Sequence, residues 1–419
     1  MSYRKFCAEV FDPPPFVESP PPPEWEPPTG YGQHYETLGT TVDGEPTIFI
    51  SIASYRDDLC HNTIKEALRM AEHPRRLFFG AVEQSIPSQG DLPCNFTMVP
   101  CDVDPSQLLC VYSGQITVHR VDARGAQGPT YGRYRADRLY RGEYFALQID
   151  AHMYFVANWD TEMIKQWKAT GNEYAVLTTY PSAYAPGSMD GSGHSSHKST
   201  PLICKSEFDV DGMVRHQAAG EIFPMASLNG SPILQPVWAA GSSFSRGHRV
   251  ARVPYGLLRL VFNGEETVMA LRMWTSGYDF YTFHHVLLFH TYNRKTRPKT
   301  FWENTQQNGL KAKTMENVEI MLGLRRPLAG YDTKDISPGA KYGLGQKRQV
   351  STFLRLWGYD LRHKAARDNC PWAYSQEMHM DLTAHLRPDG MGIDYGKVPV
   401  DEIVQRHGWA DLPSQDLAW

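Results

Sequence analysis

Apolar residues gather in short runs along the middle of the chain, and each run has the length of a buried strand. The first, TIFISIASY, follows Pro46 and ends at the turn-forming sequence Tyr55-Arg56-Asp57-Asp58. Its β-branched residues favour a strand over a helical segment of the same length. The same pattern predicts strands at residues 47–55, 76–84, 115–122, 145–150, 174–181 and 286–290.

Between these runs the apolar residues take helical spacing. Ile64, Leu68 and Ala71 share one face of a helix that Pro74 would stop. Strands that alternate with helices indicate an α/β fold, built from βαβ units around a mostly parallel sheet. The pattern predicts helices at residues 63–72, at 134–144, at about 160–169 with Asp160 as the N-cap, and within 263–280.

The chain divides into three parts by composition. Residues 1–46 are rich in proline and predict a flexible tail. Residues 47–303 hold the alternating strands and helices and form the predicted catalytic domain. Residues 304–419 predict a mostly helical C-terminal extension.

Composition and charge narrow the class of protein. Hydrophobic residues make up 41% of the 419 residues, enough for a substantial core. The net charge of −4 lacks the basic surplus of a dedicated nucleic-acid binder. No run approaches the ~18 apolar residues of a membrane helix, and the first residues lack the apolar segment of a secretory signal. Seven cysteines without a C-x-x-C pair favour a reducing compartment. We therefore expect a cytoplasmic protein with no nucleic-acid and no membrane partner.

The triplet Asp150-Ala151-His152 is the most informative chemical pattern. It directly follows a predicted strand, and ligands of open α/β sheets bind at the carboxyl ends of strands. Carboxylate oxygen and imidazole nitrogen together suit Mn²⁺ or a similar divalent ion, which would neutralise the diphosphate of a nucleotide sugar. His290, at the end of another predicted strand, is a candidate third ligand. The alternative for both segments is structural: an aspartate that caps a turn, and a histidine satisfied within the fold.

Glu265 and Glu266 open the helix predicted within 263–280, and they allow two interpretations. Carboxylates at a helix start interact favourably with the helix dipole. A glutamate beside the reacting sugar would instead orient the acceptor or stabilise positive charge at the anomeric carbon.

Basic residues beside turns are candidates for phosphate contacts. Arg124 and Arg133 flank glycines upstream of Asp150, and Arg294 follows His290. The backbone around Arg56, at the end of the first strand, could receive a nucleotide. The chain lacks both the P-loop and the dinucleotide-binding glycine motif, which argues against an NTPase or a dehydrogenase.

Taken together, several segments resemble one family and occur in its order. They are SIASYRDD, ARGAQGPTYGRYRADRLYRGEYFALQIDAHMYFVANWD, LTTYP, FNGEETVMALRMWTSGYDFY, HTYNR and YGLGQKR. They look like glycosyltransferase family 60, the polypeptide α-N-acetylglucosaminyltransferases, over residues 46–360. The resemblance implies a GT-A fold, a Rossmann-like mixed sheet flanked by helices.

The resemblance also implies a reaction: retaining, metal-dependent transfer of GlcNAc from UDP-GlcNAc to a protein hydroxyl, with hydroxyproline ahead of serine or threonine. Mn²⁺ or Mg²⁺ is the implied cofactor, and a ubiquitin-ligase adaptor subunit is an implied acceptor. Another UDP-sugar, a glycan or small-molecule acceptor, and a non-catalytic UDP-sugar-binding scaffold stay open as alternatives. The implied roles are metal ligation by Asp150, His152 and His290; donor contacts by Ser54, Tyr55, Arg56, Arg124, Arg133, Asp150 and Arg294; catalysis by Glu265 and Asp150; and support by Trp274 and Glu266.

Overall fold

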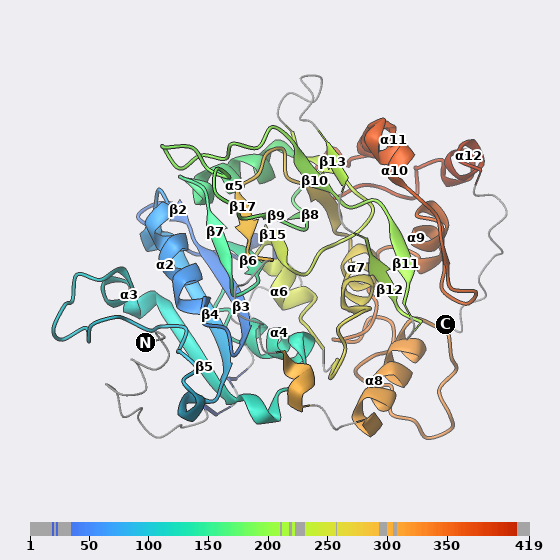
Figure 1. Ribbon diagram of the computed structural model, residues 1–419. Coiled ribbons are helices and arrows are strands. Elements are labelled where there is room, and N and C mark those ends of the chain that lie inside the picture. Colours follow the sequence, from blue (N-terminus) through green and yellow to red (C-terminus); the bar gives the residue numbers. More distant parts are fainter. Residues whose placement is uncertain are drawn as a thin grey trace.

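A mixed β-sheet runs through the centre of the molecule (Figure 1). The computed structural model describes residues 19–20, 22–23, 35–209, 212–217, 220–222, 231–256, 258–292, 300–304 and 308–408. Within these residues the sheet has eight strands, in the order β14 (Ile233–Leu234), β16 (Asp279–Thr282), β8 (Ala175–Thr178), β15 (Ser242–Arg246), β6 (Phe145–Ile149), β3 (Ile48–Tyr55), β4 (Leu77–Ser85) and β5 (Ile116–Asp122).

The sheet is less parallel than the sequence pattern predicts. Strand β3 lies parallel to β4 and β6, and β4 lies parallel to β5. Strand β15, however, inserts antiparallel between β6 and β8. Its residues, SSFSR, are all buried but mostly polar. Because they form no apolar run, the sequence pattern did not predict this strand. The predicted α/β class, with a mixed sheet flanked by helices as expected of a GT-A fold, is confirmed.

Helices and short 3-10 turns connect and flank the strands. None of the helices in the described part of the chain is both long and apolar enough to cross a membrane. The helices and 3-10 turns described within residues 47–304 are α2 (Cys60–Met70), η2 (Pro74–Arg76), η3 (Pro87–Gln89), α3 (Leu108–Val111), η4 (Ser113–Gln115), η5 (Ala123–Gly125), α4 (Pro129–Asp137), α5 (Trp159–Ala169), α6 (His248–Arg252), α7 (Glu265–Thr275) and η7 (Phe301–Asn304).

Helix α4 starts five residues earlier than predicted and ends at Asp137. Pro129 occupies the first turn, where a missing N–H costs nothing, and Gly128 before it takes a φ of 93°. The glycine at 132 lets the helix approach β3, because a Cβ there would lie 3.2 Å from the Cβ of Ala53. The prediction of a helix at 134–144 was therefore wrong in position. It relied on the aromatic and arginine residues of that stretch, whereas the helix starts earlier, at Pro129.

Asp160 is not the N-cap of α5, which is Asn158. The Asp160 side chain is 0% exposed and pairs with Arg76 at 2.8 Å. Its carboxylate also accepts from the backbone N–H groups of Glu72 and His73. Asp160 thus holds the turn between α2 and β4 rather than beginning a helix.

Small sheets complete the fold, and one of them carries part of the candidate site. Its central strand β17 (Leu288–His290) lies between β7 (Met153–Phe155) and β9 (Ser182–Ala183). The other pairs are β10 (Thr200–Leu202) with β13 (Gly220–Ile222), β11 (Ser206–Phe208) with β12 (Val214–His216), and β18 (Tyr359–Asp360) with β19 (Ala365–Ala366).

The described residues include a segment before Pro46 with secondary structure. The turn η1 (Tyr35–Thr37) leads into the hairpin of β1 (Thr41–Val42) and β2 (Glu45–Pro46). This segment is tied to the sheet, because Arg246 donates to the carbonyl of Leu38 at 2.7 Å. Most of the predicted Pro-rich tail lies outside the described residues.

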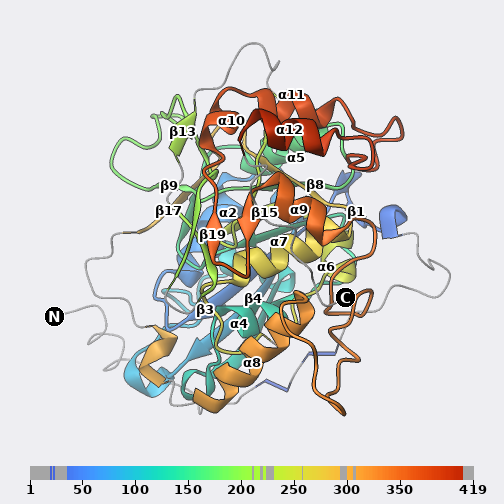
Figure 2. The same ribbon diagram turned by 90° about the vertical axis from the view of Figure 1, so that its right-hand side faces the viewer.

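The C-terminal extension packs beyond α7, on the opposite side of the molecule from α2 and β5 (Figures 1 and 2). Its helices are α8 (Asn308–Met321), α9 (Val350–Leu356), α10 (Cys370–Tyr374), α11 (Glu377–Thr383) and α12 (Val400–Arg406). Trp274 of α7 anchors the contact, with its ring 5.4 Å from that of Phe353 and 4.9 Å from that of Tyr395. Trp274 lies nine residues from Glu265, about 13 Å along the helix, so it supports the extension rather than the site.

Six cysteines form disulfides, which the sequence reasoning did not anticipate. The pairs are Cys60–Cys94, Cys101–Cys110 and Cys204–Cys370. Cys7 lies outside the described residues. The number and spacing of the cysteines were taken only to favour a reducing compartment, because sequence spacing alone does not tell which cysteines meet in the fold.

Candidate metal and nucleotide-sugar site

Asp150, His152 and His290 meet where two strands end. Asp150 directly follows β6, His152 lies in the turn that leads into β7, and His290 ends β17, opposite Met153. The Nε2 atoms of the two histidines are 2.8 Å apart, and His290 Nε2 lies 3.3 Å from Asp150 Oδ2. One potential ligand atom from each residue falls within 4.8 Å of the others. The structure thus brings together the three residues that the sequence pointed to as metal ligands.

The donor atoms fit a divalent cation. His152 Nδ1 lies 2.8 Å from Asp57 Oδ2, which makes Nδ1 the proton donor and leaves a lone pair on Nε2. That lone pair faces His290 Nε2 at 2.8 Å, a separation that is favourable when a proton of His290 or a cation lies between the two nitrogens. One carboxylate oxygen and two imidazole nitrogens form a mixed donor set of the kind that suits Mn²⁺ or a similar ion.

Asp150 is held in its ionised form. Burial alone would raise its pKa, but the hydrogen bond to His290 and the charge of Arg133 outweigh burial and hold the pKa well below its usual range. Arg133 Nη2 lies 2.9 Å from Asp150 Oδ1. The site therefore presents an anionic oxygen at neutral pH.

Glu265 is engaged by two neighbours. Arg133 Nη1 donates to both of its carboxylate oxygens, at 2.6 and 2.7 Å, and the Tyr255 hydroxyl donates to Oε1 at 2.6 Å. Burial and the negative charge of Glu265 raise the pKa of Tyr255 well above its ordinary value, so the hydroxyl keeps its proton. Glu265 is 3% exposed, and its immediate role in this geometry is to fix Arg133 beside Asp150.

Glu266 is the second carboxyl group near the metal ligands. It accepts from the Tyr180 hydroxyl and, at 2.9 Å, from the backbone N–H of Ala240. The next residue, Gly241, passes so close to Asp150 that a Cβ there would lie 3.1 Å from Oδ2. Burial raises the pKa of Glu266 to about 7, so this group changes charge near neutral pH.

The raised pKa of Glu266 predicts a specific pH dependence of stability. Because the pKa is higher in the folded protein than the ordinary 4.5, the stabilising contribution is complete below about pH 4.5 and is lost as the pH rises through about 7. In Glu266→Gln the amide mimics the neutral acid, and we expect the decline in unfolding free energy, ~1.4 kcal/mol per pH unit at most, to disappear from this window. Urea denaturation between pH 4.5 and 8 measures it.

Glu402 offers a matched control, since it is an exposed glutamate in the first turn of α12. Glu402→Gln should leave the wild-type pH profile unchanged. A Glu266→Gln profile that also follows the wild type would show that another group titrates in this window.

The remaining predicted donor contacts have structural partners of their own or lie elsewhere. Arg56 is buried and pairs with Asp91 at 2.5 Å, and the Ser54 carbonyl accepts from Gln84. Tyr55 packs against a small cluster around Leu260. Arg124 lies exposed after β5, two strands away from β3, and pairs with Asp122. Arg294 lies outside the described residues. The contacts of these residues with a nucleotide stay predictions.

Three residues that the sequence reasoning missed complete the site: Asp57, Tyr180 and Tyr255. Asp57 follows the end of β3 as Asp150 follows β6, and β3 pairs with β6 in parallel. That shared position at one edge of the sheet was the available signal. Tyr180 and Tyr255 carry no pattern in sequence, because only the folded chain brings them to Glu266 and Glu265.

Among the comparisons with known proteins, a match to a family model shows the family of this chain. A family model described as a glycosyltransferase (GlcNAc) matches residues 47–106 and 100–363. No curated protein sequence matches. Among solved structures, GalNAc-T7 with UDP, GalNAc and Mn²⁺ is similar at 11% identity and a TM-score of 0.44, over 74% of this chain and 60% of that one. Residues 1–349 of TarS from S. aureus, in complex with UDP-GlcNAc, are similar at 10% identity and a TM-score of 0.34, over 68% of this chain and 77% of that one.

Proposed function

The chain belongs to the GlcNAc glycosyltransferase family, and on that premise we propose that it transfers GlcNAc from UDP-GlcNAc to a protein hydroxyl, with retention of configuration and with Mn²⁺ as cofactor. Within the family, we propose that it acts as a polypeptide α-N-acetylglucosaminyltransferase of family 60. The observation that carries the proposal is the convergence of Asp150, His152 and His290 at the carboxyl end of β6.

Some residues around this point would bind the metal ion, and others position the residues that bind it. Asp150, His152 and His290 would hold the ion, which when bound would neutralise charge on the diphosphate. Arg133 keeps Asp150 ionised and in place, and Glu265 with Tyr255 fixes Arg133. We propose Glu266, which accepts from the N–H of Ala240 one residue before the Gly241 that adjoins Asp150, as the carboxyl group that would contact the sugar or the acceptor. The protein thus supplies orientation and charge rather than a strong base.

For the acceptor, we propose a protein hydroxyl, with hydroxyproline ahead of serine or threonine and a ubiquitin-ligase adaptor subunit as one substrate to test. A cytoplasmic location stays a prediction from the sequence. Since disulfides persist mainly in oxidising compartments, alkylation of cysteines in freshly lysed cells provides the test: a fully oxidised Cys60–Cys94 pair would argue against the cytoplasm.

The donor is tested by incubating the purified protein with Mn²⁺ and a panel of UDP-sugars and measuring released UDP. We expect slow release that EDTA abolishes and that is fastest with UDP-GlcNAc. His290→Ala should lose this activity. His194→Ala, which changes an exposed histidine between β9 and β10, should retain it. Preference for another UDP-sugar would overturn the donor. Binding of UDP without release from any donor, even when candidate acceptor peptides are added, would favour a non-catalytic scaffold.

A further inference from the structure

The side chain of His152 is held by a residue outside the proposed metal site. Asp57 Oδ2 lies 2.8 Å from His152 Nδ1, and Asp57 Oδ1 accepts from the backbone N–H of Leu59 at 2.9 Å. The Asp57 side chain is 6% exposed. A carboxylate on the far nitrogen of a histidine ligand fixes the tautomer, sets the direction of the ring and raises the basicity of the ligating nitrogen.

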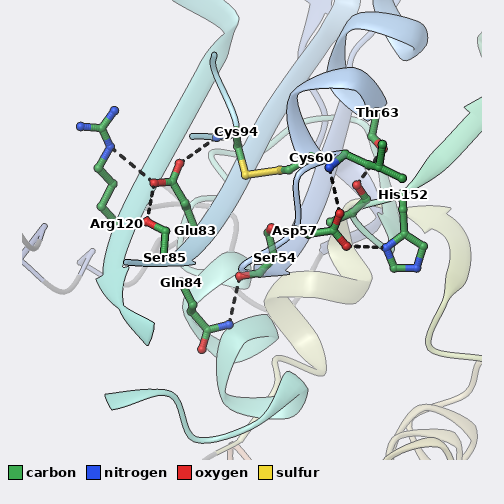
Figure 3. Close-up of a disulfide and its surroundings, with 12 residues drawn as sticks. Ser54, Asp57, Cys60, Thr63, Glu83, Gln84, Ser85, Cys94, Arg120 and His152 are labelled. Carbon is green, nitrogen blue, oxygen red and sulfur yellow. Dashed lines mark hydrogen bonds and ion pairs between the residues drawn. A yellow bond between two sulfur atoms is a disulfide. The ribbon is translucent and has the colours of Figure 1, made fainter. Parts of the chain in front are cut away.

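The backbone around His152 is held from the same direction. Thr63, in the first turns of α2, donates from its hydroxyl to the carbonyl of Ala151 at 2.9 Å. The same hydroxyl accepts from the N–H of Met153, also at 2.9 Å. Asp57 and Thr63 therefore hold the side chain and both flanking peptide groups of His152, and the two belong to one short stretch, residues 57–63, seen in Figure 3.

This stretch is in turn fastened to the loop that follows β4. Arg56, next to Asp57, takes a φ of 48° and donates to Asp91 and to Gln89 of that loop. The disulfide between Cys60, the first residue of α2, and Cys94 adds a covalent link (Figure 3). Both cysteines are 0% exposed, so the bond lies inside the folded protein. In this structure it braces the start of α2 against the loop that follows β4.

We propose that Asp57 is a positioning residue for the metal ligand His152, and that the Cys60–Cys94 disulfide fixes the stretch that carries Asp57. The inference rests on the proposed function, because it assumes that His152 ligates a divalent cation. It adds that the affinity for this cation depends on residues that do not touch it. Loss of such an outer carboxylate weakens metal binding by ~10–100-fold.

The experiment measures Mn²⁺ affinity, not turnover. The electron paramagnetic resonance signal of free aqueous Mn²⁺ is followed while the protein is titrated with Mn²⁺. We expect Asp57→Ala to weaken Mn²⁺ binding at least tenfold. Asp57→Asn preserves the shape and the bond from Leu59, but its amide nitrogen donates to His152 Nδ1 instead of accepting, which favours a proton on Nε2, so we expect at least as large a loss. Asp58→Ala is the matched control and should bind as wild type. The double variant Cys60→Ser/Cys94→Ser should also bind several-fold more weakly, whereas Cys101→Ser/Cys110→Ser, which removes a neighbouring disulfide, should not.

The outcomes separate this inference from the proposed function. Absence of Mn²⁺ binding by the wild-type protein would overturn the proposed metal site itself. Wild-type binding that Asp57→Ala and Asp57→Asn leave unchanged would overturn the inference alone. Circular dichroism and thermal unfolding verify that each variant is folded; if Asp57→Ala is not, Asp57→Asn decides. Equal losses of affinity in the two disulfide variants would mean that general loosening, and not this brace, weakens the site.

Discussion

Replacing Asp150 with asparagine is expected to lower UDP-sugar turnover by ~10³-fold or more, with the fold retained. The asparagine can still accept the hydrogen bond from Arg133, so the packing around β6 is preserved. What is lost is the anionic oxygen that faces His290 Nε2 at 3.3 Å. Charge stabilisation through a bound cation contributes several kcal/mol to a transition state, and ~4 kcal/mol corresponds to ~10³ in rate. Initial rates of UDP release measure the loss.

Asp122→Asn provides the matched control. Asp122 also ends a parallel strand of the central sheet, but it pairs with the exposed Arg124. Its replacement should leave turnover close to wild type. An Asp150→Asn protein that keeps more than a few per cent of activity would refute the assignment of Asp150 as a metal ligand.

The second large effect concerns stability. Arg133→Met should destabilise the protein by ~3–5 kcal/mol, because removing one partner of a buried ion pair leaves the other charge uncompensated. The side chains of Arg133 and Glu265 are 7% and 3% exposed, and their atoms approach to 2.6 Å. Urea denaturation at pH 7 measures the change in unfolding free energy.

Two further variants make this prediction specific. Arg133→Met/Glu265→Met removes both charges of this pair and should recover part of the lost stability, as apolar replacement of a whole buried pair often does. Asp150 loses its partner Arg133 in both variants. Arg124→Met, which removes the arginine of an exposed pair, should change stability little. A double variant less stable than Arg133→Met alone would show that Glu265 is stabilised mainly by Tyr255 rather than by Arg133.

The sequence predicted the buried strands that consist of runs of apolar residues. Strands β3, β4, β5 and β6 lie within about a residue of their predicted ranges. Strand β15 was missed because its serines are buried by tertiary packing, not by hydrophobicity. The start of α4 was missed because Gly128 and Pro129, the true start signal, precede the periodic residues.

The metal ligands were predictable from the ends of strands and from spacing. Asp150 and His290 lie at the ends of predicted strands, His152 lies two residues after Asp150, and the structure brings the three together. The hydrogen-bond network that supports them was not predicted. Arg133 lies more than a hundred residues before Tyr255 and Glu265, and the three meet only in the folded chain. Asp57 had the same strand-end signal as Asp150, yet its contact with His152 depends on the pairing of β3 with β6.

The central claim, a divalent-metal site that binds the diphosphate of a UDP-sugar, is tested most directly by calorimetric titration of the protein with UDP in the presence and absence of Mn²⁺. The account predicts saturable binding with Mn²⁺, at least tenfold weaker binding in EDTA, and no effect of Mn²⁺ on the affinity of Asp150→Asn for UDP. Equal UDP affinity with and without Mn²⁺ in the wild-type protein would contradict it.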